Sequence, residues 1–139
     1  MKLLINTDGG ARGNPGPAGL GVVIAEETGK ILKRFGRYLG DNVTNNQAEY
    51  QAIIDAMIAA KKLGGTVLEF RLDSELAVRQ LSHIYKVKNR DLQSLFLKVK
   101  NLETEFEKVV FLHVPREQNH LADQMVNEAI DQAQGLTPP

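Results

Sequence analysis

Two carboxylates lie where apolar segments of this 139-residue chain end. Asp8 closes a run that starts at Leu3, and Asp73 closes another that starts at Val67. In sheets with parallel strands, ligands bind beyond the carboxyl ends of the strands. If the two runs pair as parallel strands, the two carboxylates lie side by side and can act on one ligand.

Two further acids lie on the apolar faces of expected helices. Glu49 precedes Ile53 by four residues and Ala56 by seven, so it shares their face and points toward the protein interior. Asp123 precedes Val126 by three residues and belongs to the first turn of the last expected helix. Both positions put a carboxylate near a buried surface.

Each acid except Glu49 also has a simple structural explanation. Asp8 could be a turn residue, Asp73 could cap the helix that follows it, and Asp123 could interact with the helix dipole. Glu49 is harder to explain in this way, because a carboxylate that faces the core must be paired or bound to a cation.

Four carboxylates that converge without basic partners repel one another and raise one another's pKa values. A bound divalent cation resolves this conflict, and hard oxygen ligands favour Mg²⁺ or Mn²⁺. Carboxylates around two such ions suit in-line phosphoryl transfer. The acids therefore indicate a metal-dependent phosphoryl-transfer site.

The elements that must position these acids follow from the hydrophobic pattern. Expected strands cover residues 1–8, 20–25, 30–39, 67–72 and 107–114. Expected helices run from 44 or 45 to about 63, from 74 to 81, from 89 or 91 to 102, and through 121–130, whereas residues 9–19, 40–46 and 116–119 are expected to be loops. Short connections make the first three strands an antiparallel meander, and the whole predicts an α/β fold with helices packed on a mixed sheet.

Composition excludes several other classes of protein. The length fits one domain, expected over residues 1–134 with a flexible tail at 135–139. There is no cysteine, which excludes disulfides and thiolate metal sites, and the three histidines disfavour zinc. No apolar run is long enough for a membrane span, and the N-terminal one is too short for a signal peptide, so a cytoplasmic protein is expected.

Four motifs, in this order, resemble type 1 ribonuclease H. They are Thr7-Asp8-Gly9-Gly10 with Gly13-Asn14-Pro15-Gly16-Pro17, Thr44-Asn45-Asn46-Gln47-Ala48-Glu49, Asp73-Ser74-Glu75, and Arg116-Glu117-Gln118-Asn119 with Ala122-Asp123. The resemblance covers residues 2–132 and implies a ribonuclease H-like fold with a five-stranded mixed sheet, three strands antiparallel and two parallel.

The resemblance implies endonucleolytic hydrolysis of the RNA strand of an RNA–DNA hybrid, leaving 5′-phosphate and 3′-hydroxyl ends. The four acids of the family fall on Asp8, Glu49, Asp73 and Asp123. Two Mg²⁺ ions, with Mn²⁺ as an alternative, would bridge the scissile phosphate, one activating water and the other stabilising the leaving oxygen.

Substrate contacts are also implied by the resemblance. Asn14 and Asn45 match positions that contact the minor groove and the RNA 2′-hydroxyls, and Gln47 lies beside them. Thr44 matches a position that binds a phosphate of the DNA strand. Turn formation and helix capping are the alternative roles of these residue types.

The chain departs from many family members in two places. The segment between the helices at 74–81 and 89–102 is too short for their extra basic helix, so Lys86, Lys88 and Arg90 would offer a smaller basic surface. Arg116 stands where those members carry a histidine that assists product release, and it is included in the candidate catalytic set.

Three functions of different classes remain. The first is a hybrid-specific, metal-dependent ribonuclease that acts as a monomer. The second is a non-catalytic nucleic-acid-binding module on the same fold, although such a module is expected to have lost some of the four acids, which this chain retains. The third is a two-metal phosphatase that acts on small phosphate esters.

Overall fold

The computed structural model describes residues 1–83 and 86–136. The strands are β1 (Lys2–Ala11), β2 (Gly16–Glu26), β3 (Ile31–Val43), β4 (Val67–Leu72) and β5 (Lys108–His113). The helices are α1 (Asn45–Lys62), α2 (Glu75–Leu81), α3 (Arg90–Glu103), the short 3-10 helix η1 (Arg116–Asn119) and α4 (His120–Ala133).

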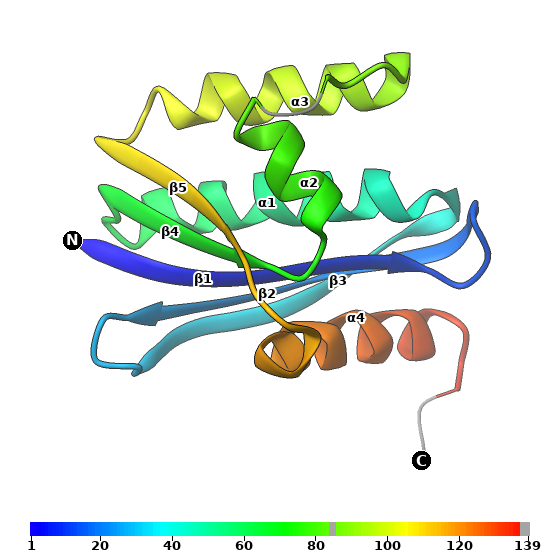
Figure 1. Ribbon diagram of the computed structural model, residues 1–139. Helices are drawn as coiled ribbons and strands as arrows, with labels where there is room; N and C mark the ends of the chain where they lie inside the picture. The colour runs from blue at the N-terminus through cyan, green and yellow to red at the C-terminus, as the bar shows by residue number, and fades with distance from the viewer. Residues whose placement is uncertain (84–85, 137–139) are drawn as a thin grey trace.

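The strands form one sheet in the order β3-β2-β1-β4-β5. β1 pairs antiparallel with β2, and β2 pairs antiparallel with β3, whereas β1, β4 and β5 run parallel. The predicted mixed sheet is thus confirmed. Figure 1 shows α1, α2 and α3 on one side of this sheet and α4 on the other.

The main core lies between α1 and the sheet. The N-terminus of α1 is fixed by a capping box, in which Thr44 Oγ1 accepts from the backbone N–H of Gln47 and Gln47 Oε1 accepts from that of Thr44, at 3.1 and 3.0 Å. Such caps contribute about 1 kcal/mol. Fully buried side chains from α1 and the strands then fill the core, among them Tyr50, Ile53, Met57, Leu3, Ile5, Leu20, Leu68 and Phe70.

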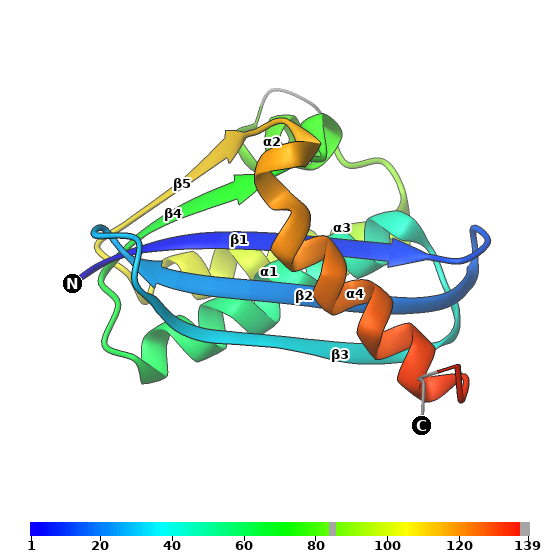
Figure 2. The same cartoon turned by 90° about the horizontal axis from the view of Figure 1, so that it is seen from below.

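The opposite face of the sheet carries α4, which crosses β1, β2 and β3 (Figure 2). Glycines let the helix backbone approach the strands. A Cβ atom on Gly21 would lie 2.0 Å from the carbonyl oxygen of Ala122, and one on Gly36 would lie 2.4 Å from that of Met125. Because a side chain there would push the helix away, these glycines fix the depth of α4 and of Asp123 in its first turn.

The three segments expected to be loops differ from the prediction. Those at 9–19 and 40–46 are partly strand, and the one at 116–119 is a 3-10 helix. β1 continues beyond Asp8 to Ala11 and pairs there with the start of β2, and β3 extends to Val43. The prediction that Asp8 ends its strand is therefore wrong: pairing with the next strand keeps this glycine-rich segment extended despite its low strand propensity. Residues 116–119 form η1 instead of an irregular loop. Of the expected flexible tail at 135–139, the last three residues lie outside the described part of the chain.

Candidate active site

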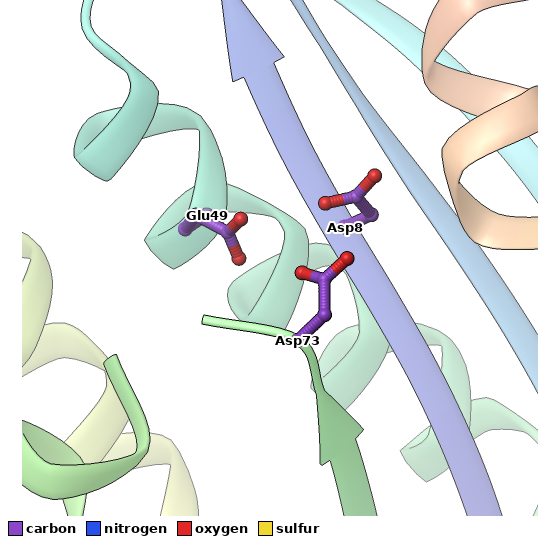
Figure 3. A group of neighbouring side chains, drawn as sticks. All are labelled: Asp8, Glu49 and Asp73. Atoms are coloured by element: carbon purple, nitrogen blue, oxygen red, sulfur yellow. The ribbon is translucent and has the colours of Figure 1, made fainter. Parts of the chain in front are cut away.

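Three carboxylates meet at the edge of the sheet where β4 ends. Figure 3 shows Asp8 on β1, Glu49 on α1 and Asp73 after β4, with their side chains directed toward one another. One carboxylate oxygen from each lies within 4.8 Å of the others. Asp8 and Glu49 are 7% and 8% exposed. Asp8 and Glu49 form the buried part of an acidic cluster, and Asp73 is its partly buried member.

The parallel pairing of β1 and β4 explains why Asp8 and Asp73 meet. Lys2 lies opposite Val67 and Asn6 lies opposite Arg71, and the same offset of 65 residues takes Asp8 to Asp73. The two carboxylates therefore lie side by side, as predicted, although β1 itself runs on beyond Asp8.

Glu49 reaches the cluster because α1 lies directly on β1. A Cβ atom on Gly9 would lie 2.2 Å from the carbonyl carbon of Ala48 and 2.4 Å from the backbone nitrogen of Glu49. The space beside Gly9 is thus filled by the backbone of α1. Gly9 is thus the residue that lets Glu49 approach Asp8.

The electrostatics of the cluster follow from burial and from mutual repulsion. Burial, followed by the charge of Asp73, raises the pKa of Asp8 from 3.8 to about 8. Burial and the charge of Asp8 hold the pKa of Glu49 well above its ordinary value. The pKa of Asp73 is also raised, chiefly by burial, although a hydrogen bond from Asn119 partly opposes the shift. Without a cation, the ionised form of the cluster is therefore electrostatically unfavourable.

Asp123 lies at the edge of the same cleft, on α4. Its carboxylate is within hydrogen-bonding reach of Asp8, and its side chain is 34% exposed. Nη2 of Arg116 lies 3.9 Å from Asp123 Oδ1, and the Arg116 side chain is 80% exposed. Asp123 is thus more accessible than Asp8 and Glu49.

Asn119 is a site residue to which sequence reasoning gave no role. It is 2% exposed, and its Nδ2 donates to the carbonyl oxygen of Thr7 at 2.8 Å. Its Oδ1 accepts from Asn6 at 3.0 Å, while its side chain hydrogen-bonds Asp73. Asn119 therefore anchors η1 to β1 and orients Asp73. Its place just before the helix that carries Asp123 was the available signal.

The predicted substrate-contact residues divide between two clefts. Asn45 lines the cleft of about 500 Å³ that also contains the four acids and Arg116. Asn14, Thr44 and Gln47 line a neighbouring cleft of about 240 Å³.

Local hydrogen bonds hold these same residues in place. Asn14 Oδ1 accepts from the backbone N–H of Asn45 at 3.0 Å, and Asn45 Oδ1 accepts from that of Ala11 at 2.8 Å. Thr44 and Gln47 form the capping box described above. The turn and capping roles that the sequence left open for these residues are therefore present in the fold.

The donor set fits a hard divalent cation. Glu49 Oε2 is buried and has no hydrogen-bond partner among the described residues. Carboxylate oxygens are the ligands that Mg²⁺ and Mn²⁺ prefer, and a cation there would offset the repulsion that raises the pKa values. Asp8, Glu49 and Asp73 have the geometry of a metal-binding group, with Asp123 beside them.

Comparison with known proteins places this geometry in a family. The sequence profile of a family described as reverse transcriptase-like matches residues 6–129. The crystal structure of LC11 RNase H1 in complex with an RNA/DNA hybrid superposes with a TM-score of 0.91 at 47% identity, covering 95% of this chain and 99% of that one. The chain belongs to the type 1 ribonuclease H family.

Two further relatives support the membership. RNase H1 of the archaeon Halobacterium salinarum superposes with a TM-score of 0.92 at 38% identity, covering 95% of this chain and 99% of that one. A bifunctional protein of Mycobacterium tuberculosis is 40% identical over 134 residues, which are 96% of this chain and 36% of that protein. The chain thus spans about a third of the length of the first curated relatives that it matches.

Among the helices of residues 1–83 and 86–136, none is both long enough and apolar enough to cross a bilayer.

Proposed function

We propose that this chain is a metal-dependent endoribonuclease that hydrolyses the RNA strand of RNA–DNA hybrids and leaves 5′-phosphate and 3′-hydroxyl ends. The observation that carries the proposal is the group formed by the buried Asp8 and Glu49 and the partly buried Asp73, whose oxygens lie within 4.8 Å, in a chain of the type 1 ribonuclease H family. LC11 RNase H1, which was crystallised with an RNA/DNA hybrid, supports the same substrate class.

The four acids would hold two Mg²⁺ ions, or Mn²⁺ in their place. When bound, such ions activate water and stabilise the charge on a leaving oxygen. Asp8 and Glu49 contribute buried carboxylates whose ionised form needs a cation, because burial raises both pKa values. Asp123, at the exposed side of the cleft, contributes a ligand that can adjust to the substrate.

Around the acids, polar residues would select and hold the hybrid. Asn14 and Asn45 are proposed to contact the minor groove, where the 2′-hydroxyl distinguishes RNA from DNA, with Gln47 beside them. Thr44 is proposed to contact a phosphate of the DNA strand. Arg116, exposed at the mouth of the cleft, would attract the phosphate backbone and assist product release.

A panel of labelled RNA–DNA, RNA–RNA, DNA–DNA and single-stranded substrates, each with Mg²⁺ and with Mn²⁺, tests the proposal. Cleavage of the RNA strand of the hybrid is expected, and the Asp73→Asn variant is expected to bind the hybrid without cleaving it. Hybrid binding without metal-dependent cleavage by the parent would indicate a non-catalytic module instead. Turnover of a sugar phosphate in place of the hybrid would indicate a phosphatase.

The state of the protein in the cell is a further part of the proposal. We propose that the chain acts as a monomer in the cytoplasm. Light scattering of the purified protein and fractionation of the source cells are the measurements that check these two points.

A further inference from the structure

Arg12 lies in the turn between β1 and β2, and its guanidinium contacts side chains of α4. Nη1 lies 2.7 Å from Asp131 Oδ1 and donates to Gln134 Oε1 at 3.5 Å. Nη2 donates to Asn127 Oδ1 at 3.3 Å. One side chain thus ties the turn to two positions on the C-terminal half of α4, Asn127 and Asp131, and to Gln134, which follows the helix directly.

Asn127 continues this connection to the fourth acid. Its Nδ2 donates to the backbone carbonyl of Asp123 at 3.1 Å and lies 3.4 Å from the carboxylate oxygen Oδ2. An amide has a donating end and an accepting end. Because Arg12 can only donate, it holds the oxygen of Asn127 toward itself and leaves the NH₂ group facing Asp123.

The same turn is fixed to α1, which carries Glu49. Asn45, the first residue of α1, bonds to the backbone N–H of Ala11 and to the side chain of Asn14, the residues that flank Arg12 and Gly13. The backbone N–H of Arg12 closes the turn on the carbonyl of Pro17 at 2.8 Å. Arg12 therefore joins α4 to the part of the molecule that holds the buried acids.

We propose that Arg12 and Asn127 are positioning residues for the fourth carboxylate: Arg12 orients the amide of Asn127, and Asn127 holds Asp123 toward Asp8. This inference rests on the proposed function. Asp123 needs such support because it lies on a helix outside the sheet and is partly exposed, with the exposed Arg116 at 3.9 Å. Substitution of residues that orient metal ligands typically lowers metal affinity or activity by about 10–100-fold.

Two variants, Asn127→Ala and Arg12→Ala, test the proposal. Calorimetric titration of the metal-free proteins with Mn²⁺ is expected to show about a 10-fold weaker Kd for each variant. On a labelled hybrid, kcat falls and the Mg²⁺ requirement rises, while the KM for the hybrid stays that of the parent. The double variant is expected to lose no more than the worse single variant, because both residues act through one connection.

Gln124→Ala is the matched control, because Gln124 is an exposed amide on the same helix that pairs with Glu128 instead of an acid of the cleft. It should leave the Mn²⁺ isotherm unchanged. Folding of the test variants is checked by melting in chelator: alanine favours a helix at position 127, and an exposed ion pair such as that of Arg12 contributes at most ~1 kcal/mol.

Parental Mn²⁺ affinity in Asn127→Ala would overturn the proposal. So would an Arg12→Ala variant that raises KM and lowers the salt dependence of hybrid binding with unchanged Mn²⁺ affinity, since Arg12 would then be a substrate contact. If the parent cleaves no hybrid, the proposed function fails, and the Mn²⁺ isotherms still decide whether the two residues position Asp123.

Discussion

The sheet side and the α4 side of the acidic cleft hold their carboxylates by different means. On the sheet side, strand register aligns Asp8 with Asp73, and the backbone contact at Gly9 sets Glu49. On the α4 side, Asp123 depends on a helix that rests on glycines and on side-chain contacts from Asn127. Backbone contacts at glycines place both helices, but Asp8 and Glu49 are buried, whereas Asp123 is partly exposed and also depends on a side-chain contact. The two sides should therefore respond differently to substitution.

The largest difference is expected between Asp8→Asn and Asp123→Asn. Asp8→Asn should lower kcat on a hybrid by about 1,000-fold or more, because several kcal/mol of charge stabilisation depend on the buried cation site. Asp123→Asn should lower kcat by about 10–100-fold, because an amide oxygen is retained at an accessible position. Single-turnover kinetics at saturating Mg²⁺ measures both. Equal losses would show that the two sides contribute alike.

Gly9→Ala tests the backbone contact that places Glu49. A Cβ atom 2.2 Å from the carbonyl carbon of Ala48 must push α1 away, which should lower the free energy of unfolding by about 3 kcal/mol. Gly10→Ala is the matched control for stability, because its Cβ would meet Val126 Cγ1 only at 3.9 Å. Urea unfolding of both variants decides the matter, and equal stabilities would refute the role given to Gly9.

The pH dependence of stability in chelator tests the strain on the sheet side. The pKa of Asp8 rises from 3.8 to about 8 on folding, so its contribution to stability is complete below about pH 4 and is lost as the pH rises through 8. The pKa values of Glu49 and Asp73 shift in the same direction. The Tm of the metal-free protein should therefore fall by several degrees over this interval.

Three measurements of Tm against pH separate the effect of the acidic cluster from the titration of other carboxylates in the protein. Asp8→Asn should flatten the fall in Tm, and Mn²⁺ should reverse it in the parent. Glu27→Gln, at an exposed turn, should leave the fall unchanged. A parent Tm that rises steadily with pH in chelator would contradict the strained cluster.

Arg116→Ala should have the smallest effect. Its side chain is 80% exposed and 3.9 Å from Asp123, so its removal should change the free energy of unfolding by less than ~1 kcal/mol. On a hybrid, product release should slow by no more than about 5-fold, the equivalent of ~1 kcal/mol. Burst kinetics measures this step. A 100-fold loss of the chemical step would move Arg116 into the catalytic group.

The positions of three acids could be predicted from short stretches of sequence, because each acid belongs to one helical or strand-like hydrophobic pattern. The periodicity of α1 correctly put Glu49 on the buried face, and the two apolar runs correctly predicted that Asp8 and Asp73 are neighbours. Sequence reasoning failed for the glycine-rich segment, where strand pairing overrides local propensity and extends β1 to Ala11. It also gave Asn119 no role, because a buried amide looks like any polar loop residue until its partners are known.

The order of the strands and main helices, the four acids and the resemblance to type 1 ribonuclease H follow from the amino-acid sequence alone. These depend on residue identity and short-range spacing, which can be read along the chain. The folded structure was needed to show how closely the carboxylates approach, that Asp123 is partly exposed, and that Arg12 reaches Asn127 across 115 residues. Such relations depend on the distance between helices and strands, and that distance is set by packing between segments far apart in the chain.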